Sequence, residues 1–238
     1  MGELWHDGTP REAIFNLSTM NDPDVTLLDI GGADGVKRLA GSTFEDTDFS
    51  VGAATAITIN TNAGDDRVTI RSLDSSHSGR LIVKGGLGND SLNAATAGRG
   101  IKLLGEAGFD TLTGSAFADS LNGGADHDTL RGGAGNDTLD GEFGDDIILG
   151  GSGDDAIRGA DGNDDLNGEL GSDTILCNKG RDTIRGGSVG DKIHGGEGND
   201  RIEASRSLIA TGPGDDVIVG FANTIDEAFT FNFDRLML

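Results

Sequence analysis

A nine-residue period runs without interruption from residue 105 to residue 203 and constrains the fold more than any other feature of the chain. Eleven units follow one another, and each has Asp at its sixth position and Leu or Ile at its eighth. The sixth-position residues are Asp110, Asp119, Asp128, Asp137, Asp146, Asp155, Asp164, Asp173, Asp182, Asp191 and Asp200. A fixed period of this length is typical of a solenoid, in which each repeat is one structural unit stacked on the next.

The residue type at each position predicts the shape of one unit. Gly occupies the first position in ten units, the second in five and the fourth in eight, and Gly adopts φ > 0 without a steric clash. The first six residues therefore predict a turn. The last three, such as Thr138-Leu139-Asp140, alternate polar and apolar side chains and predict a very short strand with one inward side chain. Two units close one flattened coil, so we expect an all-β fold, a parallel β-roll or right-handed β-solenoid.

The balance of apolar and acidic residues in the array indicates a bound cation. One aliphatic side chain per unit is a thin core, and the eleven units carry 22 acidic against 7 basic residues. Carboxylates crowded on turns repel one another. Oxygen ligands on flexible turns are typical of calcium sites, which would remove that repulsion. A disordered acidic linker is the alternative, but a linker has no reason to place Leu or Ile at every ninth residue.

The units resemble the repeats-in-toxin (RTX) nonapeptide, Gly-Gly-x-Gly-x-Asp-x-U-x with U a large aliphatic residue, and residues 132–140 match it best. The resemblance implies that sixth-position carboxylates and turn carbonyls of coils 18 residues apart hold calcium between them. It pairs the aspartates from Asp110 to Asp200 on one side of the roll and from Asp119 to Asp191 on the other, with up to about nine ions as the cofactor. The implied turn ligands include Gly133, Gly135, Gly144, Gly151, Gly153, Gly162 and Gly171.

Some units depart from the pattern. The departures are Phe117, Asp126 and Val189 at the fourth position and Cys177-Asn178 at the first two. A Cβ at a position that needs φ > 0 costs on the order of 1–2 kcal/mol, although Asn and Asp tolerate it better. We therefore expect the weakest calcium sites at the turns of residues 114–119 and 186–191, and the best sites between residues 132 and 173.

Pairs of adjacent aspartates occur in several turns, such as Asp145-Asp146 and Asp154-Asp155. Asp146 and Asp155 hold the sixth position and are expected to bind calcium. Their neighbours Asp145 and Asp154 hold the fifth position, and we expect them to contribute mostly electrostatic field. These pairs therefore do not predict a catalytic acid and base.

The periodic array divides the chain into four parts. We expect an N-terminal segment or cap at 1–21, irregular β-solenoid coils at 22–104, the calcium-binding β-roll at 105–220 and a C-terminal cap or secretion signal at 221–238. Degenerate repeats at 61–69, 85–93 and 211–219 indicate that the solenoid extends beyond the array. Residues 10–20 are expected to form either a short helix or part of the cap. The C-terminal part holds four of the ten Phe and no Gly, which suits a cap, while RTX proteins also carry their export signal there.

Composition bears on partners and location. The net charge of −23 argues against nucleic acid or an anionic membrane as a partner, and no apolar run is long enough to span a membrane. Millimolar calcium is found outside cells, where weak sites fill. We therefore expect a bacterial protein, secreted or held at the cell surface after a type I export route, that folds on calcium. Its role would be structural, in export or in adhesion, with calcium and a carbohydrate or cell-surface component as candidate partners.

No catalytic residue is predicted, and the chain is not expected to be an enzyme. Residues 186–190 match the esterase motif G-x-S-x-G, but that motif needs a strand-to-helix turn and a triad. Two alternatives stay open. One is a polysaccharide-active β-helix enzyme with its groove on residues 24–104, where the basic residues Arg67, Arg71, Arg80 and Lys84 are scattered. The other is the C-terminal fragment of a larger RTX toxin, protease or lipase.

Overall fold

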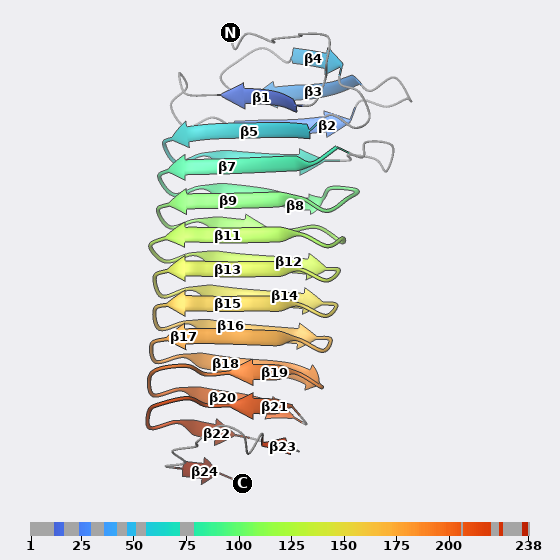
Figure 1. The fold of residues 1–238 in the computed structure, drawn as a ribbon. Coiled ribbons are helices and arrows are strands. Elements are labelled where there is room, and N and C mark those ends of the chain that lie inside the picture. The colour runs from blue at the N-terminus through green and yellow to red at the C-terminus, as the bar shows by residue number, and fades with distance from the viewer. Residues whose placement is uncertain are drawn as a thin grey trace.

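Two sheets of mainly parallel strands, stacked face to face, form a tall β-solenoid in the computed structural model (Figure 1). The structure describes residues 12–16, 24–29, 36–41, 47–50, 56–71, 79–205, 207–219, 224–225 and 235–237. All regular secondary structure in these residues is β-strand. The all-β parallel solenoid predicted from the nine-residue period is therefore confirmed.

Apart from β3, odd-numbered and even-numbered strands belong to different sheets, because from β5 onward the chain crosses from one sheet to the other after each strand. The eleven-stranded sheet contains β1 (Glu12–Asn16), β5 (Ala56–Ala63), β7 (Leu81–Leu87), β9 (Lys102–Ala107), β11 (Ser120–Ala125), β13 (Thr138–Phe143), β15 (Ala156–Asp161), β17 (Thr174–Lys179), β19 (Lys192–His194), β21 (Leu208–Ala210) and β23 (Thr224–Ile225). The thirteen-stranded sheet contains β2 (Asp24–Asp29), β3 (Val36–Gly41), β4 (Thr47–Ser50), β6 (Arg67–Arg71), β8 (Ser91–Thr96), β10 (Thr111–Thr113), β12 (Thr129–Ala134), β14 (Ile147–Ser152), β16 (Asp165–Leu170), β18 (Thr183–Val189), β20 (Arg201–Ser205), β22 (Val217–Val219) and β24 (Arg235–Met237).

Most strands of the array are longer than the sequence predicts. β13 has six residues, not three, because the first three positions of the next unit continue the ladder: Gly124 pairs with Glu142, and Ala125 pairs with Phe143. Glu142 at the second position has a φ of 72°, so the strand kinks there without losing its neighbours. The turn is limited to positions four to six, and the prediction of a six-residue turn is wrong.

The core is a double stripe of aliphatic side chains. Every eighth-position Leu or Ile is at most 3% exposed, and Val68, Leu92 and Ile218 extend the stripe beyond the array. The first position also faces inward: a Cβ on Gly132 would lie 2.4 Å from Asp137 Oδ2. The sequence predicted one inward side chain per unit. That prediction is incomplete, because the sixth-position aspartates are buried as well.

The ends of the solenoid differ from its middle. β3 and β4 pair antiparallel with β2 and with each other, whereas the sequence predicted only irregular parallel coils there. A short helix was one expectation for residues 10–20. That expectation is wrong for Glu12–Asn16, which form the strand β1. The rest of the predicted N-terminal cap lies outside the described residues. So does the predicted C-terminal cap or signal, apart from β23 and β24.

Candidate metal centre

The turns stack into two columns, one along each edge of the solenoid. Turns that follow odd-numbered strands form column 1, at the left of Figure 1, and turns that follow even-numbered strands form column 2. Column 1 contains Asp66, Asp90, Asp110, Asp128, Asp146, Asp164, Asp182, Asp200 and Asp216, and column 2 contains Asp119, Asp137, Asp155, Asp173 and Asp191. All fourteen side chains are at most 5% exposed.

Each column is joined by one repeated hydrogen bond. The backbone N–H of Asp128 donates to Oδ1 of Asp146 at 2.7 Å, and the N–H of Asp146 donates to Oδ1 of Asp164 at 2.9 Å. In column 1 this bond recurs between all nine aspartates, from Asp66 to Asp216, at 2.7 to 3.0 Å. The ladder fixes one carboxylate oxygen of each aspartate and leaves the other to point elsewhere.

The second carboxylate oxygen is buried and accepts no hydrogen bond in most of these turns. Such an Oδ2 atom occurs in Asp90, Asp110, Asp128, Asp137, Asp146, Asp155, Asp164, Asp173, Asp182, Asp200 and Asp216. A buried acceptor without a donor costs roughly 1–3 kcal/mol, and a charged one costs more. Eleven such atoms in one small protein indicate that a positively charged group completes these turns.

The orphaned oxygens face carbonyl oxygens of the next coil. A Cβ on Gly105 would lie 2.2 Å from Asp110 Oδ2 and 2.5 Å from the Gly123 carbonyl oxygen. At Gly132 the corresponding distances, to Asp137 Oδ2 and the Gly150 carbonyl oxygen, are both 2.4 Å. Each space therefore holds acceptor oxygens from two coils, and the first-position Gly leaves room for them. This donor set suits a hard cation such as calcium.

The predicted turn glycines bring further carbonyls together. A Cβ on Gly151 would lie 2.0 Å from the Gly133 carbonyl oxygen, and one on Gly153 would lie 2.0 Å from that of Gly135. Of the seven predicted glycines, all except Gly162 have positive φ. In the described part of the chain no three His, Cys, Asp or Glu side chains converge on one point. Any cation in a turn must therefore take main-chain oxygens in addition to carboxylates.

Burial makes these carboxylates hard to ionise without a cation. Burial, together with the like charges of Asp110 and Asp146, raises the pKa of Asp128 to about 8, against the lowering effect of the hydrogen bond from Asp110. Burial also raises the pKa of Asp137 and of Asp164 to about 7, again with aspartates of the same column adding to the effect. Protons and cations therefore compete for the same oxygens.

Two aspartates of column 2 differ from the rest because a serine supplies a donor. Asp119 Oδ2 accepts a short hydrogen bond from the backbone N–H of Ser115, and Ser115 Oγ lies 3.2 Å from Asp119 Oδ1. Asp191 Oδ2 accepts a hydrogen bond from Ser207 Oγ at 3.1 Å. Both serines are buried. The two turns are the same ones in which Phe117 and Val189 replace the fourth-position Gly.

The fifth-position aspartates have structural partners. Asp145 Oδ1 accepts the backbone N–H of Asn163 at 2.8 Å, and Asp154 Oδ1 accepts that of Ser172 at 2.8 Å. The hydrogen bond from Asn163 lowers the pKa of Asp145. The prediction that these residues contribute mostly field is therefore wrong: they form a second, exposed ladder outside the buried one.

Three aspartates of column 1 were not among the predicted ligands. Asp66, Asp90 and Asp216 hold the sixth position of the degenerate repeats at 61–69, 85–93 and 211–219. Their backbone and side-chain hydrogen bonds continue the ladder in both directions. At these ends, successive aspartates of the column are 24, 20 and 16 residues apart. They therefore fall outside the 18-residue period that predicts the others.

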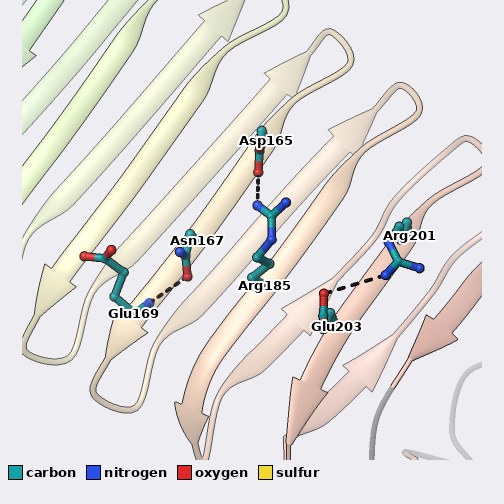
Figure 2. A network of polar contacts seen from close by, with 6 residues as sticks. All are labelled: Asp165, Asn167, Glu169, Arg185, Arg201 and Glu203. Carbon is teal, nitrogen blue, oxygen red and sulfur yellow. Dashed lines mark hydrogen bonds and ion pairs between the residues drawn. The ribbon is translucent and has the colours of Figure 1, made fainter. Parts of the chain in front are cut away.

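The outer faces of the sheets carry ion pairs and polar contacts, several of which link neighbouring coils. Figure 2 shows Arg185 of β18 paired with Asp165 of β16, and Arg201 beside Glu203 on β20 at 3.7 Å. The esterase-like Ser188 is engaged with the neighbouring coil, because its Oγ donates to the Gly171 carbonyl at 2.6 Å and accepts the Gly171 N–H at 2.9 Å. It lies within a parallel strand and not at a strand-to-helix turn.

Comparison with known proteins agrees with this geometry. The family model of the RTX calcium-binding nonapeptide repeat, which describes four copies, matches residues 104–139, 140–175 and 178–206. A search of curated proteins found no match. In the described residues there is also no helix that could cross a membrane. The matched part of the chain therefore carries RTX calcium-binding nonapeptide repeats.

Proposed function

We propose that calcium, bound between successive turns by the sixth-position aspartates and turn carbonyls, drives the folding of this solenoid. The observation that carries the proposal is the set of eleven buried Oδ2 atoms without a hydrogen-bond donor. Each calcium ion would supply positive charge to carboxylates of two coils, and so would join neighbouring coils. In the folded chain the hydrogen-bond ladder holds these carboxylates in the orientation that the ion needs.

The two columns are expected to hold unequal numbers of ions. Column 1 has seven spaces bounded on both sides by an orphaned Oδ2, from Asp90 to Asp216. Column 2 has two such spaces, between Asp137 and Asp173, because Ser115 and Ser207 already serve Asp119 and Asp191. The total of about nine equals the number implied by the RTX resemblance, but the expected split of five and four becomes seven and two.

The energy involved is large for a single protein domain. With a dissociation constant of about 10⁻⁴ M, which is typical of extracellular sites, millimolar calcium stabilises the fold by roughly 1.4 kcal/mol per site. About nine sites would then contribute on the order of 13 kcal/mol, comparable to the whole stability of an ordinary domain. Calcium would therefore decide whether the array is folded.

This dependence supports a location where calcium is abundant. Weak sites fill at millimolar calcium outside a cell and stay empty at the low concentration inside, so the chain would fold after export from a bacterial cell. The long rigid roll suits a structural, export or adhesion role. We propose no catalytic residue.

Counting the bound ions tests the proposal directly. Native mass spectrometry of the protein in calcium, with magnesium as the matched control, should show about nine calcium ions and few magnesium ions, because magnesium demands tighter octahedral geometry and retains its water. Binding of no calcium, or of equal numbers of both ions, would show that the turns are not coordination sites.

A further inference from the structure

A hollow of about 890 Å³ lies where the turns of column 2 lead into the strands of the eleven-stranded sheet. Its lining comes from the coils of β7, β9, β11 and β13. In these coils Lys102 pairs with Ile82 on one side and with Ser120 on the other, and Ser120 pairs with Thr138. The residue two positions before each of these paired residues also lines the hollow. These residues are Arg80, Gly100, Ala118 and Asn136.

The hollow exists because two successive coils lack a long side chain. Gly100 has none and Ala118 has only a methyl group, whereas Arg80 and Asn136 stand at the two ends of the row. Neighbouring strands are about 4.8 Å apart, so the row from Arg80 to Asn136 spans roughly 14 Å. The hollow is therefore elongated along the solenoid and suits a short chain-like ligand.

The hollow is basic, although the protein as a whole is strongly acidic. Arg80, Arg99 and Lys102 line it, and its one carboxylate, Asp119, is buried and accepts hydrogen bonds from Ser115 and Ile101. Arg80 and Lys102 are exposed, and neither has an ion-pair partner among the residues described.

Nearby Lys84 behaves differently, because it pairs with Glu106 of the next coil at 3.6 Å. The charges of Arg80 and Lys102 are thus available to a ligand.

We propose that this hollow binds a short acidic saccharide. The three cationic side chains suit carboxylate or sulfate groups. The Asn136 amide and the Ser120 and Thr138 hydroxyls suit the hydroxyl groups of sugar rings, since they both donate and accept hydrogen bonds.

Calcium should promote this binding. The chain has a net charge of −23, which repels anions, and each bound calcium ion removes two negative charges. The saccharide proposal goes beyond calcium binding, but it rests on the calcium-loaded fold.

The test is calorimetric titration of the calcium-loaded protein with a trimer of a uronic acid, and with the corresponding neutral trimer. The test variant combines Arg80→Gln with Lys102→Gln. The matched control combines Arg71→Gln with Arg131→Gln, which removes the same charge from two exposed residues on the other sheet. A third variant, Ala118→Glu, places a carboxylate in the middle of the hollow.

The uronic acid trimer should bind, and the neutral trimer should not. The test variant should weaken binding by about tenfold or more, the control by less than about twofold, and Ala118→Glu should abolish it. Absence of binding by the acidic trimer, equal binding of the neutral trimer, or equal weakening in test and control variants would overturn the proposal. Failure of the saccharide proposal can be distinguished from failure of calcium-driven folding. The latter would appear in far-UV circular dichroism during a calcium titration of the unmodified protein, without any saccharide.

Discussion

Asp128 and Asp146 are joined across one coil of the solenoid by a hydrogen bond of 2.7 Å from the backbone N–H of Asp128 to Oδ1 of Asp146. The other oxygen of Asp146, Oδ2, is buried and accepts no hydrogen bond. One carboxylate thus holds two coils in register and at the same time presents a negative charge to the space between them. These two functions can be separated by mutation.

Asp146→Asn should raise the calcium concentration needed for folding and lower its cooperativity, because it removes a charged ligand while keeping an oxygen for the Asp128 N–H. Asp146→Ala should raise that concentration further, since it also removes the hydrogen bond. Loss of one site in a stack weakens the coils on both sides. Calcium titrations followed by circular dichroism would measure both effects.

Asp145→Ala is the matched control for Asp146→Ala, since it deletes a carboxylate from the same turn. Water can replace the exposed acceptor that Asn163 uses, so we expect a shift of the calcium midpoint below about twofold. If Asp145→Ala shifted the midpoint as much as Asp146→Ala, the assignment of ligands to the sixth position would be wrong.

Ser207→Ala should make folding more dependent on calcium and add one calcium ion to column 2. The substitution removes the donor to Asp191 Oδ2, and a buried carboxylate without that donor costs roughly 1–3 kcal/mol. Calcium between Asp173 and Asp191 would offset this loss. Calcium titration followed by circular dichroism and native mass spectrometry in calcium give the two readouts. An unchanged ion count would show that the serine does not stand in for the ion.

The sequence predicted the solenoid correctly because the period fixes which side chains face inward. Leu139 and Ile157 recur in phase, and only a stacked coil buries both. The sixth-position aspartates were identified for the same reason. Their burial was not foreseen, since an Asp on a Gly-rich turn normally faces water.

Other features depend on contacts that no local pattern reveals. The six-residue strands arise because Glu142 and its counterparts keep their ladder partners despite positive φ. Ser207 comes 16 residues after Asp191, and only the stacking of coils brings their side chains together. Asp90 and Asp216 were missed because coils of unequal length break the period while the column continues.

Acid should stabilise the calcium-free solenoid and oppose calcium. Burial raises the pKa of Asp128 to about 8 and of Asp164 to about 7, far above the value of about 4 in an unfolded chain. The folded form therefore binds more protons than the unfolded form between about pH 4 and pH 8, so its stability falls as the pH rises through this window.

In chelator, far-UV circular dichroism should accordingly show more β structure at pH 5 than at pH 8.5. In calcium the order should reverse, because calcium binds the deprotonated carboxylates and acid competes with it. The same order of β content in chelator and in calcium would contradict the assignment of these aspartates to the calcium sites.

Gly153→Ala should destabilise the centre of the array even in excess calcium. Gly153 has a φ of 131°, and a Cβ there would lie 2.0 Å from the Gly135 carbonyl oxygen. We expect a loss of at least about 2 kcal/mol. Ser172→Ala, on an exposed turn position, should change stability by less than about 0.5 kcal/mol. Equal urea midpoints for the two variants would show that the turns do not stack closely.

The most direct test of calcium-driven folding is far-UV circular dichroism of the unmodified chain, first in excess chelator and then with calcium or magnesium added at equal concentration. We predict a largely disordered spectrum in chelator, a cooperative change to a β-rich spectrum at millimolar calcium and no such change with magnesium. A β-rich spectrum that persists unchanged in chelator, or that forms equally with either ion, would contradict the account.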